Sequence, residues 1–202
     1  MPRLLFPAAL ALIVAWHTAP NAQGARVAGP MYSSGGELLR PADYREWVYL
    51  TSGLGMTYGS AQAAAGRPAN FDNVFVNREA YQQFMSTGKW PDGSIFALEI
   101  RGAEEHVSID NAGRTQGNQI ALEVSVKDSS RFPKTTWAYF DFGPASKPFA
   151  STGPLPESAS CYQCHKTNTA VEWTFVQFYP TLLEVARRMG TVKPTYDPTH
   201  KP

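Results

Sequence analysis

Alternation of apolar and polar positions is clearest in residues 119–128, where Ile120, Leu122, Val124 and Val126 are separated by polar or small residues. This period of two predicts a β-strand that is buried on one face. Shorter runs, rich in aromatic and β-branched residues, predict further strands. These runs lie at 47–50, 71–77, 94–102 and 135–143.

Two helices are predicted by apolar residues that recur three or four positions apart. The first follows Asn77, which can cap it, and stops at Gly88. The second begins at Pro180 and ends at Gly190. Residues 40–46 predict a short helical turn. The order of elements predicts one α+β domain, mainly an antiparallel β-sheet with a few helices.

The first 25 residues form a separate segment, with Arg3, an apolar run from Leu4 to Trp16 and then small residues up to Ala25. The run is shorter than the roughly 20 residues that span a bilayer. Residues 1–25 therefore predict a secretory signal peptide, with an uncleaved anchor as the alternative. The mature chain is then a domain at 26–190 and an extended or disordered tail at 191–202, exported to the periplasm or another oxidising compartment.

Charge and cysteine content exclude several classes of protein. The chain has 18 basic and 17 acidic residues and no basic run, so binding to nucleic acid or to an anionic membrane is not expected. Two cysteines cannot build a disulfide scaffold or an all-cysteine zinc site. The aromatic content of 12% suits a β-rich core or the walls of a cofactor pocket.

Both cysteines lie in the motif Cys161-Tyr-Gln-Cys164-His165. A spacing of three places both sulfurs on one side of a helical turn, where they can form thioethers with the two vinyl groups of a haem. The adjacent histidine would then bind the iron. A redox dithiol is expected earlier in the chain, after a strand, and a zinc site would need both His106 and His200 as further ligands. The motif predicts haem c, with a redox dithiol or a structural disulfide as the alternatives.

The ligand opposite His165 decides what the iron can do. An electron carrier usually has a second strong ligand, a methionine or a histidine. Met189 falls on the apolar face of a predicted helix, and His106 lies in an acidic, solvated loop. The expected site is therefore five-coordinate and open to a small ligand. A six-coordinate carrier that uses Met56 or Met85 is the alternative.

An ordered set of segments carries a family resemblance. These segments are GGELLRPADYREWV, PDGSIFALE, LEVSVKDSSRF, WAYFDF and CYQCHKTN with FVQFYPTLL. Together they cover most of the mature chain, which resembles the cytochrome P460 family, including the cytochromes c′-beta. The resemblance implies a mainly antiparallel fold, commonly a homodimer, with haem c held near the C-terminus by Cys161 and Cys164 and with His165 as proximal ligand.

The chain departs from part of this family at one position. Enzymes of the family that oxidise hydroxylamine carry a lysine bonded to the porphyrin edge, and the corresponding residue here is Leu98. Lys89 could replace it only in a different strand register. Without this cross-link the resemblance implies the c′-beta branch, which binds nitric oxide and related gases in an apolar pocket. Phe71 and Phe96 are then candidates, with Leu98, for the distal wall, and an ordinary core position is the alternative for each phenylalanine.

The remaining polar candidates are Asp72, Glu99 and Arg101, which could relay protons in an enzyme, and Glu172. Strand alternation places Glu99 and Arg101 on the face opposite Leu98, where we expect solvent exposure. Glu172 is expected to be a surface carboxylate, with a proximal haem contact as the alternative. The resulting prediction is a haem protein that binds or detoxifies nitric oxide or a related nitrogen oxide. An oxidoreductase that oxidises hydroxylamine or nitric oxide and reduces a partner cytochrome is the alternative.

Overall fold

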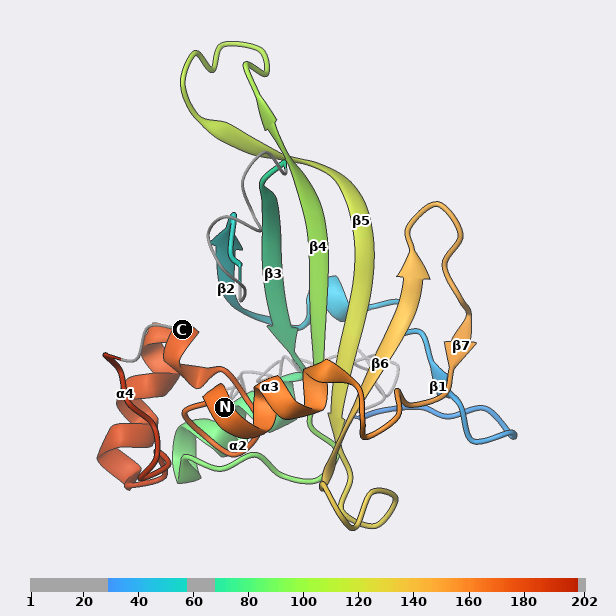
Figure 1. The fold of residues 1–202 in the computed structure, drawn as a ribbon, viewed down its shortest axis with the longest axis vertical. Helices are drawn as coiled ribbons and strands as arrows, with labels where there is room; N and C mark the ends of the chain where they lie inside the picture. Colours follow the sequence, from blue (N-terminus) through green and yellow to red (C-terminus); the bar gives the residue numbers. More distant parts are fainter. Residues whose placement is uncertain (1–28, 58–67, 200–202) are drawn as a thin grey trace, which may run out of the picture.

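The computed structural model describes residues 29–57 and 68–199, and their largest element is a five-stranded sheet (Figure 1). Successive strands pair with one another, so the order is β2-β3-β4-β5-β6 and every pairing is antiparallel. The strands are β2 (Val48–Leu54), β3 (Asn70–Val76), β4 (Ile95–Glu105), β5 (Arg114–Lys127) and β6 (Trp137–Pro144). The short strands β1 (Leu38–Leu39) and β7 (Ser151–Thr152) form a second antiparallel pair.

The helices gather near the end of the sheet where β4 begins, and the β4–β5 hairpin projects from the other end (Figure 1). These helices are α2 (Arg78–Thr87), α3 (Ser160–Asn168) and α4 (Pro180–Met189). The chain also forms two 3-10 turns, η1 (Tyr44–Glu46) and η2 (Val176–Phe178). The predicted α+β class with a mainly antiparallel sheet is therefore confirmed. Gly88 and Gly190 end α2 and α4 with positive φ angles of 69° and 66°, which glycine adopts without strain.

Asn77 precedes α2 as predicted, but its side chain makes no capping hydrogen bond to this helix. Its Oδ1 accepts a hydrogen bond from the Ile95 amide at 3.0 Å, and its Nδ2 donates to the Gly93 carbonyl at 3.3 Å. Its backbone carbonyl accepts from the Tyr81 amide at 3.1 Å. Asn77 thus connects the start of α2 to the start of β4.

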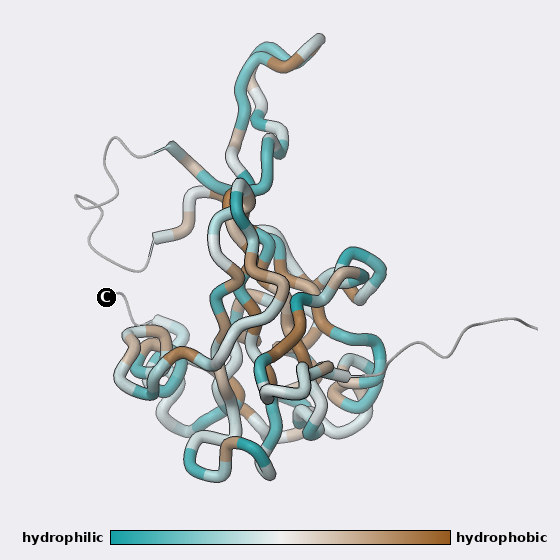
Figure 2. The backbone as a smooth tube through the Cα atoms, turned by 90° about the vertical axis from the view of Figure 1, so that its right-hand side faces the viewer, coloured by the Kyte–Doolittle hydropathy of each residue, from teal (hydrophilic) through white to brown (hydrophobic). Residues whose placement is uncertain are grey.

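The two faces of the sheet contribute to two different apolar clusters, so both faces are covered. On one face Val76, Phe96 and Trp137 pack against buried residues of α2 and α4. On the other face the buried apolar residues of β5 and Phe140 of β6 pack against Leu38, Tyr44 and neighbouring side chains. The projecting β4–β5 hairpin is mainly hydrophilic (Figure 2).

The ends of the predicted elements differ in several details. Leu122, Val124 and Val126 are buried as expected, but Ile120 is 44% exposed, next to a register irregularity in the pairing of β5 with β6. Residues 191–199 contain no helix or strand, yet the Lys193 amide donates to the Ala170 carbonyl at 2.8 Å. The predicted signal peptide lies outside the described residues. Within those residues, no helix has the length and apolar character needed to cross a membrane.

Glu99 is the centre of a buried polar cluster on the sheet face opposite Leu98. Its carboxylate accepts hydrogen bonds from Tyr44 Oη at 2.8 Å and from Arg101 Nη1 at 3.1 Å, and it forms an ion pair with Arg45. Glu99 is 3% exposed, so the expected solvent exposure was wrong. The sequence predicted a short helical turn at 40–46, which contains η1, but it did not predict that this turn covers the face that carries Glu99.

The Glu99 cluster makes stability depend on pH. Burial alone would raise the pKa of Glu99, but hydrogen bonds from Arg45 and Tyr44 outweigh it and hold the pKa below its ordinary value of 4.5. A carboxylate with a lowered folded pKa stabilises the protein above its unfolded pKa, and this contribution is lost as the pH falls through the folded pKa.

We therefore expect Glu99→Gln to lower the free energy of unfolding at pH 7 by about 1.5–3 kcal/mol, the range for hydrogen bonds to charged groups. The difference from wild type should shrink as the pH falls below 4.5. Urea unfolding at several pH values measures both effects. Glu105→Gln, in an exposed ion pair with Arg114, is the matched control and should change stability little. A pH-independent difference for Glu99→Gln would contradict the assignment.

Candidate functional site

The Cys161-Tyr-Gln-Cys164-His165 motif forms the first turns of α3, which lies across the sheet. Both cysteines are free thiols, and both line a cavity of about 570 Å³ together with His165. Cofactor sites typically have volumes of about 300–1,000 Å³. The helical spacing thus presents two thiols and one imidazole to a single cavity of suitable size.

The wall opposite α3 is made by the central strands of the sheet. Val74 on β3 pairs with Leu98 on β4, and Leu98 pairs with Glu123 on β5, so these three side chains lie side by side on the cavity face. Phe96, two residues before Leu98, lines the cavity as well. The structure therefore brings the predicted Phe96 and Leu98 together with the cysteines and His165.

Phe71 is not among the residues that line the cavity. It lies one residue before Asp72, which does line the cavity, and alternation along β3 places the Phe71 side chain on the other face. The structure therefore does not bring this predicted residue to the site. The sequence identified the strand correctly, but it did not determine which of its faces meets α3.

Two carboxylates lie in the same cavity. Glu123 is reached by solvent through the cavity, yet burial, followed by the charges of Asp141 and Asp72, raises its pKa above the ordinary value. Burial likewise raises the pKa of Asp72. The sequence analysis named Asp72 but missed Glu123, because the polar residues of a strand that is buried on one face only are expected to face solvent. The cavity is therefore apolar on one part of the sheet and acidic on another.

His165 is held on the other side of the cavity by one hydrogen bond and two aromatic rings. Its Nδ1 lies 2.7 Å from the carbonyl oxygen of Trp173, so Nδ1 must carry the proton and donate. The ring centroids of Tyr139 and Phe175 lie 4.4 Å and 4.6 Å from that of His165. Burial lowers the pKa of His165 to about 4, against the opposing effect of the Trp173 carbonyl, so the imidazole is neutral at pH 7. Its Nε2 is then available to a metal.

The two candidate methionines lie in different places. Met56 lines the cavity, and its thioether packs so closely on Gly53 that a Cβ there would not fit. Met85 packs against the apolar cluster around Phe84 and does not line the cavity. His106 lies in the exposed β4–β5 hairpin. Of these three candidates, Met56 alone lines the cavity that contains His165.

Glu172 is not a free surface carboxylate. Its Oε2 forms an ion pair with Lys127 Nζ at 2.7 Å, and the two side chains are 25% and 17% exposed. It lies in the turn after α3, directly before Trp173, whose carbonyl oxygen is 2.7 Å from His165 Nδ1. The expectation of a solvated Glu172 was therefore wrong, because β5 supplies a cation that the local sequence does not contain.

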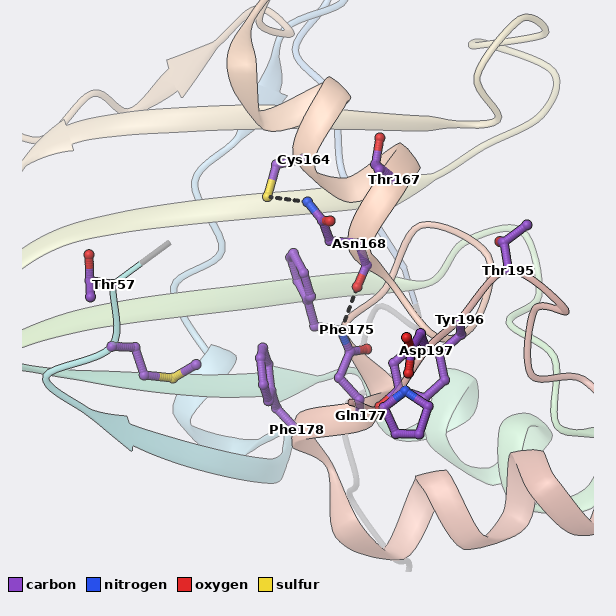
Figure 3. A pocket seen from close by; sticks show the side chains of 12 residues that line it. Thr57, Cys164, Thr167, Asn168, Phe175, Gln177, Phe178, Thr195, Tyr196 and Asp197 are labelled. Atoms are coloured by element: carbon purple, nitrogen blue, oxygen red, sulfur yellow. Dashed lines mark hydrogen bonds between the residues drawn. The ribbon is translucent and has the colours of Figure 1, made fainter. Parts of the chain in front are cut away.

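A second cavity of about 530 Å³ borders the first and shares Met56, Cys164, Phe175 and Phe178 with it (Figure 3). Phe175 and Phe178 lie stacked there, with their ring centroids 5.7 Å apart. Asn168 of α3 faces them, with its Nδ2 3.7 Å from Cys164 Sγ. Cys164 therefore lines both cavities.

The residues present fit a covalently attached haem. Two free thiols lie one helical turn apart, a neutral imidazole follows them, and all three face one cavity with a largely apolar wall. When bound, a haem supplies an iron that can take small ligands and exchange electrons. Among the described residues, no group of three or more metal-ligating side chains suggests a separate metal site.

A sequence model of the family described as Cytochrome P460 matches residues 41–176, which is more than half of the chain. The match includes β2 to β6 and the whole of α3, but it ends before α4. No curated protein matches the chain.

If both thiols bond to haem, the purified holoprotein should have the mass of the polypeptide plus one haem and keep its haem absorbance after denaturation. The double variant Cys161→Ala with Cys164→Ala should lose the haem on denaturation, because no covalent bond remains. Intact mass spectrometry and absorbance after acid–acetone extraction measure this. Ser160→Ala, which changes a neighbouring lining residue, is the control and should retain haem. Haem retained by the double variant would contradict attachment through these thiols.

Proposed function

Because the chain belongs to the cytochrome P460 family, a family of c-type haem proteins, we propose that it binds nitric oxide or a related nitrogen oxide at a five-coordinate haem iron. In this proposal Cys161 and Cys164 form two thioethers and His165 is the proximal ligand. The observation that carries it is the placement of Leu98, Val74 and Phe96 across the cavity from His165.

The inventory of ligands in the cavity supports five-coordination. Among the described residues that line it, His165 is the one imidazole and Met56 the one thioether. The Met56 sulfur packs on Gly53 near the end of β2, so this thioether already has a packing partner within the protein. A cavity with one strong iron ligand leaves the opposite position open to a small molecule.

The apolar part of the distal wall is rigid, which suits a small and weakly polar ligand. Phe96 is 5% exposed, and its ring makes an edge-on contact with Trp90 at 4.7 Å between centroids and a tilted contact with Trp137 at 5.8 Å. Leu98 occupies the position at which hydroxylamine-oxidising members of the family carry a lysine. Lys89 is exposed and precedes β4, so the observed register does not bring it to the cavity.

The cellular setting follows from features outside the site. The signal peptide predicted at 1–25 supports export, and covalent haem attachment is compatible with an extracytoplasmic compartment. We further propose a homodimer, as the family resemblance implies, and transient contact with a partner cytochrome. Edge strand β2 carries exposed Tyr49 and Leu54, at 54% and 49%, which supports a protein contact on that edge.

We expect the reduced protein to be high-spin and five-coordinate, and to bind nitric oxide with a clear spectral change. Met56→Leu should leave the ferrous spectrum unchanged, because the thioether is not an iron ligand in this proposal. Optical and resonance Raman spectra with and without nitric oxide measure this, and Met85→Leu is the matched control. A low-spin ferrous spectrum that Met56→Leu converts to high-spin would identify a six-coordinate carrier instead.

A second candidate function is oxidation of hydroxylamine, and Glu123 is the observation that favours it. This oxidation releases protons together with electrons, so a base beside the substrate would assist it. Glu123 lies next to Leu98 on the cavity face, and its pKa is raised by burial and by Asp141 and Asp72. Because the family lysine is absent, this activity would depend on the carboxylate alone.

If hydroxylamine is a substrate, Glu123→Gln should lower its oxidation rate by about 100-fold or more, the usual contribution of a general base. In wild type the rate should rise with pH through the raised pKa of Glu123, because the carboxylate must be ionised to accept a proton. Steady-state rates with an artificial electron acceptor measure both. Ser125→Ala, another lining residue of β5, is the control. Equal rates for Glu123→Gln and wild type would exclude this role, while unchanged nitric oxide affinity is expected in either case.

A further inference from the structure

We propose that Glu172, through its ion pair with Lys127, positions the proximal histidine by fixing the carbonyl group that accepts the His165 Nδ1 hydrogen bond. This inference rests on the proposed function, in which His165 binds the iron. Glu172 contacts neither His165 nor the cavity, so it is a positioning residue.

The backbone at Glu172 has an uncommon conformation that something must stabilise. Its φ angle is 49°, in the left-handed region that non-glycine residues rarely occupy. The surrounding turn is closed by hydrogen bonds from the Thr174 amide to the Val171 carbonyl at 2.9 Å and between Thr169 Oγ1 and the Glu172 carbonyl at 2.9 Å. Trp173 follows directly, so the conformation of Glu172 determines where the Trp173 carbonyl points.

The Glu172 side chain is anchored by groups from three places in the chain. Its Oε2 accepts from Lys127 Nζ at 2.7 Å and from Trp137 Nε1 at 3.3 Å, and its Oε1 accepts from the Trp90 amide at 3.3 Å. Lys127 also donates to the Trp90 carbonyl at 2.7 Å. The turn after α3 is therefore fastened to the ends of β5 and β6 and to the segment before β4.

The ion pair is well suited to hold a strained turn. Lys127 and Glu172 have side chains that are 17% and 25% exposed, so water screens their attraction less than at an open surface. The indole N–H of Trp137 and the backbone amide of Trp90 supply further hydrogen bonds to the same carboxylate. The anchor thus combines charge with directional hydrogen bonds, which restricts rotation of the turn.

The consequence for the iron comes through the imidazole. A hydrogen bond from Nδ1 to a carbonyl orients the ring and makes Nε2 a stronger electron donor to a bound metal. If the turn relaxes, the 2.7 Å contact between Nδ1 and the Trp173 oxygen lengthens and the donation weakens. The iron–histidine bond should then weaken, and the ferric state should lose stability relative to the ferrous state.

The test uses Glu172→Gly and Lys127→Met in the full-length holoprotein, with Glu184→Gln on the exposed face of α4 as the control for loss of a carboxylate. Glycine adopts the left-handed conformation freely, so Glu172→Gly removes the anchor without adding backbone strain. The two variants remove opposite charges. A purely electrostatic effect would therefore raise the reduction potential in Glu172→Gly and lower it in Lys127→Met.

The iron–histidine stretching frequency, measured by resonance Raman spectroscopy of the ferrous protein, reports the bond itself. Positioning predicts a lower frequency than wild type in both variants, although their charge changes are opposite, and no change in Glu184→Gln. A wild-type frequency in either variant of the ion pair would overturn the inference. Absence of an iron–histidine band in the wild-type protein would instead overturn the proposed function. Circular dichroism confirms that each variant is folded.

Discussion

The hydrogen-bonded register of β3, β4 and β5 places Val74, Leu98 and Glu123 in one row, and this row forms the wall that faces α3. A shift of one residue in β4 would replace Leu98 by Glu99 and bring a different chemistry to the cavity. The register is held from behind by Glu99, which is bonded to Tyr44, Arg45 and Arg101 on the opposite face. The geometry of the site therefore depends on the Glu99 cluster, which lies on the opposite face of the sheet.

The two sides of the cavity are built on different principles. The distal wall consists of sheet residues whose positions are fixed by strand pairing and by the packing of Phe96 against Trp90 and Trp137. The proximal side consists of one short helix and the turn that follows it, which strand pairing does not restrain. That side is held by the Glu172–Lys127 ion pair and by the hydrogen bond of His165 to Trp173. A rigid wall thus faces a histidine whose position rests on a few polar contacts.

Much of the fold followed from local pattern, because period-two and period-3.6 spacing depend only on neighbours along the chain. The five strands, α2, α4 and the glycines that end these helices were predicted, but β2 runs to Leu54 instead of ending at 50, and β5 begins at Arg114 instead of at 119. The errors concern which face of a strand is buried and which face lines the cavity. Glu99 was expected in solvent but is buried, the candidate Phe71 is not among the lining residues of the cavity, and Glu123, which does line it, was not considered. Alternation separates odd from even residues, but it cannot say what covers each set when both faces of a sheet are buried.

The sequence by itself determined which reactive groups lie together: the spacing of Cys161, Cys164 and His165 places two thiols and an imidazole on one helical turn, because a helix repeats every 3.6 residues. It also determined that position 98 carries no amine. The tertiary structure alone decided which groups meet the cavity and which hold it in place. Glu123 comes from β5, and Lys127 reaches Glu172 across 45 residues of chain. Such contacts arise when separate elements pack together, and no local pattern encodes them.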